Sequence, residues 1–276
     1  MSYFTEENSE NAVLSRLADD VDPRFRQIMK SAINHLHGFV KDVDPTMDEW
    51  MQAIQFLTAI GQICDENRQE WILASDTLGV SMLVDAINHR RPDGATENTV
   101  LGPFHVSNAP EKKNGENICL DGKGMPCIVN GRVTDEAGNP IAGAKVDVWQ
   151  TNDDGLYNVQ QLDVQPEMNM RGVFTTDAEG RYDFVTVKPL PYSIPTDGPV
   201  GLMLNAMGRH AMRPAHIHYI VTAPGYETLV THIFSDDDPY LESDAVFGVK
   251  ESLIASFEST EDGWKVDFDI KLKKID

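Results

Sequence analysis

His216 and His218, two histidines separated by one residue, form a pair that could hold a metal ion. The stretch that they open, residues 216–222, is rich in β-branched and aromatic residues, which favours a strand over a helix. Side chains alternate faces along a strand, so both imidazoles point the same way, roughly 6.7 Å apart along the backbone, and Ile217 points the other way into a core. Arg213 lies close enough to place a permanent positive charge near the same centre. An H-x-H pair alone is a weak signal, and its weight depends on the residues that accompany it.

Two long loops each contribute a tyrosine that completes such a set. Tyr157 follows the segment 152–156, and Tyr192 lies in residues 190–201, a stretch too rich in proline and glycine to be regular. Loops of this length in a compact domain are usually functional. A phenol has a pKa near ~10, so only a strongly Lewis-acidic ion keeps it deprotonated at neutral pH, and ferric iron suits a phenolate better than zinc or copper(I). A single tyrosine more often packs in a core with its hydroxyl hydrogen-bonded, but two tyrosines beside two histidines suggest a four-ligand site.

The N-terminal part of the sequence has the periodicity of helices. Apolar residues follow helical spacing over residues 23–43, and Thr46 to Glu49 resembles a capping box that starts a second helix. Two shorter helices are expected at about Arg68 to Leu78 and at Met82 to Asn88. The pattern changes near residues 90–94, after which glycines and prolines become frequent.

Beyond this change the apolar period drops to two, as in strands. Cys127 to Val133 and Ala144 to Gln150 alternate on either side of a turn at Asp135 to Pro140. Further strands are expected at residues 180–187, 216–222, 228–234 and 264–271. Short strands with regular turns describe a β-sandwich. The predicted fold class is therefore α+β, with a helical N-terminal domain at residues 1–98 and a mostly-β sandwich domain at residues 99–276.

The overall composition narrows the partners of the protein. A formal net charge of −21 over 276 residues argues against DNA, RNA and anionic membranes, because phosphate binding needs clustered lysine and arginine. No run approaches the ~18 apolar residues of a membrane span, and the polar N-terminus lacks the apolar segment of a signal peptide. The cysteines Cys64, Cys119 and Cys127 have no metal-like spacing, and so sparse and odd a set is typical of a reducing compartment. We therefore expect a cytoplasmic protein with no membrane span and no nucleic-acid partner.

Taken together, the motifs resemble those of the intradiol ring-cleavage dioxygenases. The resemblance runs through Thr99–Phe104, Val148–Gln150, Gly155–Tyr157, Gly180–Tyr182, Tyr192–Gly201 and Arg213–His218, from the helical region almost to the C-terminus. It implies an N-terminal helical domain that forms a homodimer and can hold a phospholipid, followed by a sandwich that holds one non-haem Fe(III) per subunit. By the same resemblance the metal ligands are Tyr157, Tyr192, His216 and His218.

The resemblance also implies a reaction and two catalytic residues. An ortho-diphenol binds the iron through both oxygens and displaces Tyr192, and dioxygen then opens the ring to a cis,cis-muconate that keeps both oxygen atoms. Arg213 falls on the conserved arginine of the family, where it would stabilise the developing negative charge in a water-poor site.

Within the family, the sequence is most similar to enzymes that act on hydroxyquinol (benzene-1,2,4-triol) and give 3-hydroxy-cis,cis-muconate, the enol form of maleylacetate, in the catabolism of aromatic compounds. The cue is the segment from Leu229 to Leu241, in which His232 stands where catechol enzymes carry glutamine. Asp76 could accept a hydrogen bond from the third hydroxyl of hydroxyquinol, and a surface carboxylate at a helix end is the competing interpretation. Leu101 stands where hydroxyquinol enzymes are expected to carry phenylalanine, which leaves catechol or chlorocatechol as alternative substrates. By resemblance the pocket residues are Leu73, Asp76, Val100, Leu101, Gly102, Pro103, Phe104, Ile194, Pro195 and Val246.

Two other interpretations remain open on the sequence alone. The segment from Val129 to Trp149 also resembles transthyretin-like and carbohydrate-binding modules, which bind ligands without catalysis, and a fold alone does not decide function. A binding module would have no reason to assemble two tyrosines, two histidines and Arg213, which favours the enzyme. The apolar stripes of the helical region are explained by dimerisation and lipid binding, or equally by ordinary packing on the sandwich.

Overall fold

The computed structural model describes residues 3–65, 68–90 and 94–275. Contacts divide the chain into two compact units, Met1–Ala59 and Ile60–Asp276. The domain boundary predicted after residue 98 falls inside the second unit, so that two of the expected helices belong to the same unit as the sheets. The change of pattern expected at 90–94 includes residues 91–93, which lie outside the described residues.

The first unit is helical, as predicted. Its helices are α1 (Ser9–Leu14), α2 (Pro23–Val43) and most of α3 (Met47–Ile63). Helix α1 is too short to show a clear apolar period and was not anticipated. None of the helices in the described part of the chain is long and apolar enough to cross a bilayer.

Local side-chain bonds set the ends of these helices. The side chain of Asp22 accepts a hydrogen bond from the backbone N–H of Phe25 at 2.9 Å, and α2 ends where Asp44 takes a left-handed conformation. The expected capping box begins α3, because the Glu49 carboxylate accepts the backbone N–H of Thr46 at 2.8 Å and the Thr46 hydroxyl accepts that of Glu49 at 3.3 Å.

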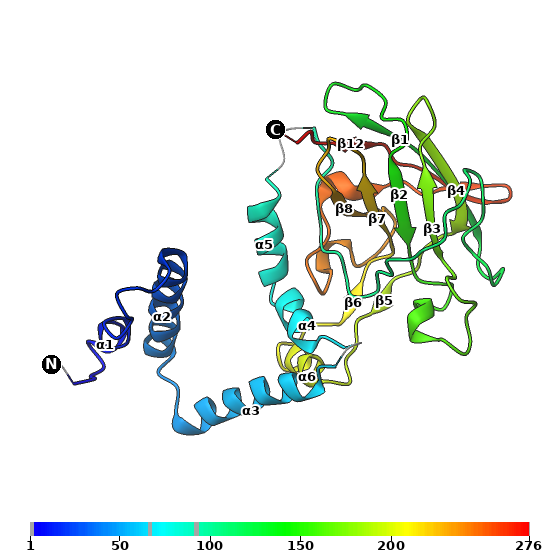
Figure 1. The fold of residues 1–276 in the computed structure, drawn as a ribbon. Coiled ribbons are helices and arrows are strands. Elements are labelled where there is room, and N and C mark those ends of the chain that lie inside the picture. The colour runs from blue at the N-terminus through cyan, green and yellow to red at the C-terminus, as the bar shows by residue number, and fades with distance from the viewer. Residues whose placement is uncertain (1–2, 66–67, 91–93, 276) are drawn as a thin grey trace. The chain divides into compact units, whose positions relative to one another are not determined.

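The second unit combines helices, among them α4 (Glu70–Thr77) and α5 (Val80–Asn88), with a two-sheet sandwich (Figure 1). In the first sheet, β1 (Pro126–Asp135) pairs antiparallel with β4 (Arg181–Val187) and parallel with both β11 (Gly263–Asp267) and β12 (Ile270–Leu272), and β10 (Glu258–Thr260) pairs with β11. The second sheet has the order β3 (Arg171–Thr175), β2 (Lys145–Trp149), β7 (His216–Thr222), β8 (Leu229–Ser235) and β9 (Ile254–Ala255). A separate pair, β5 (Tyr192–Ser193) with β6 (Met212–Arg213), lies outside both sheets.

The core lies between the two sheets and confirms the predicted alternation. Val129 and Val133 of β1 meet Val148 of β2 and Ile217 of β7 there, and all four are fully buried. Ile217 therefore faces the core, and the flanking histidines face the opposite side of the second sheet. The short 3₁₀ helices are Asn158–Gln160, Leu241–Ser243 and Glu251–Leu253.

Two sequence-based expectations about regular structure were wrong. The single strand expected at 264–271 is divided into β11 and β12, because the Asp269 side chain accepts the backbone N–H of Arg132 at 2.9 Å and interrupts the ladder along β1. The stretch 190–201, expected to be irregular, contains β5 and the start of helix α6 (Pro199–Ala206). Proline is well suited to the first helical position, since it lacks only an N–H that has no helical partner there.

Candidate active site

The register of three adjacent strands places a row of rings on the outer face of the second sheet. Trp149 of β2 pairs with His218 of β7, which pairs with His232 of β8. Residues directly opposite each other in antiparallel strands share a face. Trp149 stacks on His218 with centroids 4.6 Å apart, and His232 meets His218 edge-on at 4.1 Å. His216, two residues along β7, stacks on His232 at 4.7 Å, so that three imidazoles form one cluster.

The two tyrosines bring their hydroxyls to this cluster. The Oη of Tyr157 lies 2.7 Å from Nε2 of His218 and 3.3 Å from Oη of Tyr192, and the Nε2 atoms of His216 and His218 are 3.2 Å apart. Two atoms that share a metal ion at about 2.0–2.1 Å lie roughly 3 Å from each other. The structure thus brings together all four predicted ligands at separations that suit a common metal ion, and their donor types suit ferric iron.

His232 was not among the ligands predicted from the sequence. The structure shows that one nitrogen of each of His216, His218 and His232 lies within 4.8 Å of the others, and all three residues are buried. A sequence signal did exist, because a hairpin centred on Gly225 pairs position 218 with position 232. The three histidines could together hold a metal ion, since neutral imidazoles are common metal ligands.

The two predicted histidine ligands are oriented by different means. His216 makes a hydrogen bond between Nδ1 and the carbonyl of Pro214 at 2.7 Å, which fixes the ring and leaves Nε2 for a metal. The Nδ1 of His218 has no such partner among the described residues. Its ring is held instead by stacking on Trp149 and by Gly102, where an added Cβ would lie 3.1 Å from the Cε1 atom of His218. Gly102 has φ +77°, a conformation in which glycine is favoured.

Burial sets the protonation of the cluster. It lowers the pKa of His216 to about 3 and holds the pKa values of His218 and His232 well below the usual range, so that all three rings keep free lone pairs at neutral pH. Burial also raises the pKa of Tyr157 well above its ordinary value. Tyr157 therefore stays a phenol unless a strongly Lewis-acidic ion replaces its proton.

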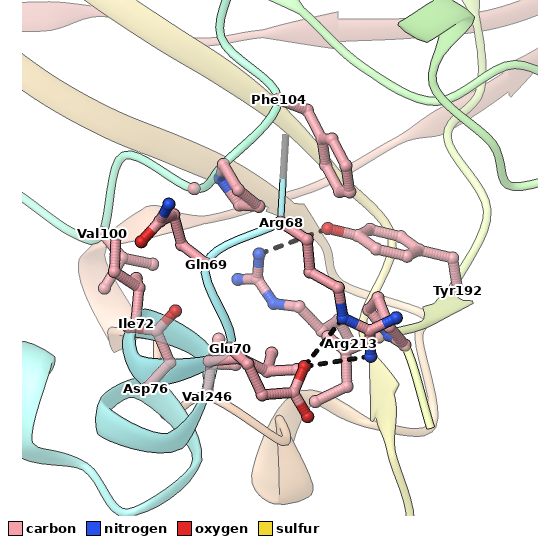
Figure 2. Close-up of a pocket in the computed structure, with 15 residues that line it drawn as sticks. Arg68, Gln69, Glu70, Ile72, Asp76, Val100, Phe104, Tyr192, Arg213 and Val246 are labelled. Carbon is pink, nitrogen blue, oxygen red and sulfur yellow. Dashed lines mark hydrogen bonds and ion pairs between the residues drawn. The ribbon is translucent and has the colours of Figure 1, made fainter. Parts of the chain in front are cut away.

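Arg213 places its guanidinium between a carboxylate and the donor atoms. Its Nε and Nη2 donate to the Oδ1 and Oδ2 of Asp244 at 3.1 and 3.3 Å. Its Nη1 lies 3.5 Å from Oη of Tyr192, as the dashed line in Figure 2 marks, and 3.3 Å from Nε2 of His216. Burial alone would raise the pKa of Asp244, but the charge and hydrogen bonds of Arg213 outweigh it and leave that pKa below its usual value. Both groups are therefore charged.

A pocket of about 90 Å³ opens beside Tyr192 and Arg213 (Figure 2). Of the residues predicted to line the substrate pocket, those found there are Leu73, Asp76, Val100, Gly102, Pro103, Phe104, Ile194, Pro195 and Val246. Leu101 does not line this pocket and instead lines a neighbouring hollow. The pocket also includes residues that the sequence did not single out, namely Arg68, Gln69, Glu70 and Ile72. Gln69 and Ile72 could have been found, since positions 69, 72, 73 and 76 share one face of a helix.

Asp76 is a buried acid within the pocket and not a surface carboxylate. It is 8% exposed, and Figure 2 shows it across the pocket from Tyr192. Burial raises its pKa, while a hydrogen bond from Ser81 and the charge of Arg213 act in the opposite direction. A buried acid facing a mostly apolar cavity is suited to receive a hydroxyl of a ligand.

Comparison with known proteins extends over the whole chain. A family model described as "Dioxygenase" matches residues 100–274, and one described as "Catechol dioxygenase N terminus" matches residues 22–96. The hydroxyquinol 1,2-dioxygenase of Rhizobium sp. strain MTP-10005 is 58% identical over 99% of this chain and 97% of that one. The 6-chlorohydroxyquinol 1,2-dioxygenase of Cupriavidus pinatubonensis is 50% identical over 99% of each chain. The solved structure of hydroxyquinol 1,2-dioxygenase from Pseudomonas putida DLL-E4 superposes with a TM-score of 0.93 at 48% identity, over 98% of this chain and 99% of that one.

Proposed function

Because this chain belongs to the intradiol dioxygenase family, we propose that it cleaves hydroxyquinol with dioxygen, between the two adjacent carbons that bear hydroxyls. The product is 3-hydroxy-cis,cis-muconate, the enol form of maleylacetate, and both oxygen atoms of dioxygen enter it. The single observation that supports this most strongly is the convergence of two phenols and two imidazoles, 2.7–3.3 Å apart, beside a pocket that contains a buried acid. A ligand-binding module would use neither the donor set nor the buried cation beside it.

We propose that the metal is Fe(III), one per subunit, held by Tyr157, Tyr192, His216 and His218. Two phenolates offset much of the charge of a ferric ion, and the neutral histidines complete a mixed set of donors. The bound ion would supply the Lewis acidity that keeps the phenols and the substrate hydroxyls deprotonated, and would draw electron density from the aromatic ring.

The residues of the chain then have separate tasks. Tyr192 is only partly buried and lines the pocket, so its Oη is placed to accept a proton from an entering diol. Tyr157 is 1% exposed and stacks on Phe104 with centroids 4.5 Å apart, which suits a ligand that stays in place. Arg213 directs its Nη1 at the same centre and stabilises negative charge as it develops.

Asp76 gives the pocket a means to prefer hydroxyquinol. The third hydroxyl of benzene-1,2,4-triol lies para to one of the two that bind the metal, and Asp76 lies across the pocket from Tyr192 (Figure 2). A carboxylate accepts several hydrogen bonds and Ser81 supplies only one, so a ligand that lacks the third hydroxyl forgoes a further one and binds less well. The apolar wall formed by Val100, Pro103 and Ile194 excludes water from the ring.

Oxygen uptake with the iron-loaded protein tests this function. We expect one dioxygen consumed per hydroxyquinol, slower turnover of catechol, and a dicarboxylate product that carries both labels when ¹⁸O₂ is used. Turnover of catechol that matches or exceeds that of hydroxyquinol would overturn the substrate assignment. A product with one label would overturn the reaction type.

We also propose that the helical region forms a homodimer and holds a phospholipid, and that the protein works in the cytoplasm. Helix α2 leaves Phe25, Ile28, Leu36 and Phe39 exposed in a single chain, more apolar surface than an isolated helix keeps in water. The three cysteines are free, as in a reducing compartment.

Light scattering tests the homodimer and should give twice the mass of one chain. The double variant Leu36→Lys, Phe39→Lys should lower the measured mass. Mass spectrometry of an organic extract tests for the lipid.

A further inference from the structure

We infer that Asp244 is a positioning residue for the reaction, which acts by holding the guanidinium of Arg213 in the one orientation that directs Nη1 at the donor atoms. This inference rests on the proposed function, since it assigns a role to Asp244 only through Arg213. Nothing in the local sequence links the two residues, which lie 31 positions apart.

The carboxylate of Asp244 is itself fixed on both sides. Its Oδ1 accepts the Nε of Arg213 at 3.1 Å and the backbone N–H of Val246 at 3.2 Å. Its Oδ2 accepts the Nη2 of Arg213 at 3.3 Å and the backbone N–H of Gly248 at 2.9 Å. With its side chain 2% exposed, the acid cannot turn without leaving backbone donors unpaired. Asp244 is therefore a rigid support for the side chain of Arg213.

The ion pair occupies one edge of the guanidinium and leaves its opposite end to face the donor atoms. Asp244 occupies Nε and Nη2, and only Nη1 remains for Tyr192 at 3.5 Å and His216 at 3.3 Å. Tyr192 and Arg213 are also paired in register on β5 and β6, so a shift of the arginine would move it relative to the phenol. An arginine has several rotatable bonds and five N–H donors, so it can adopt many orientations unless a partner holds it. Asp76 is close enough for the charges of the two groups to interact. Without Asp244, the guanidinium would be free to turn toward Asp76.

A glycine next to the pair shows how closely the surroundings fit it. A Cβ added at Gly248 would lie 3.0 Å from Nη2 of Arg213, 3.1 Å from Oδ2 of Asp244 and 3.2 Å from the Thr99 hydroxyl. Gly248→Ala therefore pushes on the ion pair while it keeps both charges. In this second variant Arg213 is displaced but keeps its ion pair with Asp244.

Asp238 provides a matched control. It is 8% exposed, and its oxygens accept the backbone N–H groups of Ala215 and Tyr240, each at 2.9 Å. It supports the chain one residue before His216 but makes no hydrogen bond to Arg213 among the described contacts. Asp238→Asn thus removes a comparable buried charge without releasing the arginine.

The test is a double-mutant cycle of Asp244→Asn and Arg213→Gln in iron-loaded protein, with Asp238→Asn and Gly248→Ala alongside. Displacing a catalytic group by about 1 Å can cost ~100-fold in rate, so we expect Asp244→Asn and Arg213→Gln each to lower kcat about 100-fold. KM, iron content and the visible absorption band should change little, because no ligand is lost. In the double variant kcat should equal that of Arg213→Gln alone. The kcat of Asp238→Asn should stay within about 3-fold of that of the unaltered protein. Gly248→Ala should lower kcat and retain iron.

Three outcomes would overturn the inference. They are unchanged kcat in Asp244→Asn, separate effects that multiply in the double variant, or an equal loss in Asp238→Asn. If Asp244→Asn fails to fold, Gly248→Ala decides: full kcat there would also overturn it. Unchanged kcat in Arg213→Gln would instead overturn the proposed role of Arg213, which keeps the two failures distinct.

Discussion

The site has two halves that are built in different ways. The strand half, His216, His218 and His232, lies on paired strands whose other face fills the core, and all three side chains are at most 2% exposed. The loop half, Tyr157 and Tyr192, comes from an irregular segment before a 3₁₀ helix and from the two-residue strand β5. Tyr192 is only partly buried. Strand register fixes the first half, and local contacts hold the second.

This difference suits a catalyst that must keep its metal and still exchange a substrate. The strand half cannot move without breaking the sheet, so we propose that it would anchor the ion. The loop half contains Tyr192, the ligand proposed to exchange, which borders the pocket. The predictions below test whether the strand half retains the metal and the loop half permits substrate exchange. They begin with the largest expected effect.

The first prediction concerns the strand half. His216→Ala or His218→Ala should weaken ferric iron binding by at least about 100-fold, because loss of a direct ligand costs more than the 10–100-fold typical of its outer partners. Metal analysis after dialysis against a chelator measures this. His232→Gln is the matched change, and it should keep iron. Iron retained by both alanine variants would show that the strand half is not the anchor.

The second prediction separates the two tyrosines. Tyr157→Phe should lose iron, whereas Tyr192→Phe should keep a substantial fraction of it and lose about 100-fold in kcat, as expected when a proton acceptor is removed. Metal content and oxygen uptake of the same preparations give both values. If the two variants behave alike, the proposed division of roles between the tyrosines is wrong.

The third prediction probes the close contact between Gly102 and the ring of His218. Gly102→Ala should lower iron affinity by about 10-fold, because the added Cβ would lie 3.1 Å from the ring. Gly208→Ala is the control, since Gly208 has a similar φ of +67° with no atom within 4 Å of an added Cβ. Both variants should lose about 1 kcal/mol of stability from the left-handed backbone, and only the first should bind iron less well.

The fourth prediction concerns Asp76 and selectivity. Asp76→Asn should raise KM for hydroxyquinol about 10-fold and leave KM for catechol nearly unchanged, because only the triol loses a hydrogen bond to a charged acceptor. Burial raises the pKa of this acid above its value in the unfolded chain, so its ionisation lowers the stability of the fold as the pH rises above the unfolded pKa. The variant should therefore be the more stable at pH 7, by a margin that shrinks as the pH is lowered toward about 4. Equal changes in KM for both substrates would remove Asp76 from the selectivity argument.

The strand half was largely predictable from the sequence because a strand has a fixed period. Alternation alone put His216 and His218 on one face and Ile217 in the core, and the fold class followed from the same period. Recognition of the hairpin at Gly225 would have added His232. The two long loops suggested the tyrosines, and the family resemblance, confirmed by the comparisons, implied the same two residues.

The rest depends on contacts between distant segments. Arg68 and Glu70 meet Tyr192 and Arg213 in the pocket only through tertiary packing. Asp244 approaches Arg213 through a loop whose course no local pattern specifies. The start of α6 could not be told from an irregular loop, because proline and glycine give the same local signal at a helix start as in a turn.

The visible spectrum of the iron-loaded protein, recorded before and after anaerobic addition of hydroxyquinol, tests the four-ligand site most directly. The account predicts a tyrosinate-to-Fe(III) charge-transfer band that moves to longer wavelength with hydroxyquinol, and at lower concentration than with catechol. The band should be absent in Tyr157→Phe. A protein that stays colourless after reconstitution with Fe(III) would contradict the account, because the two phenols would then not bind the metal.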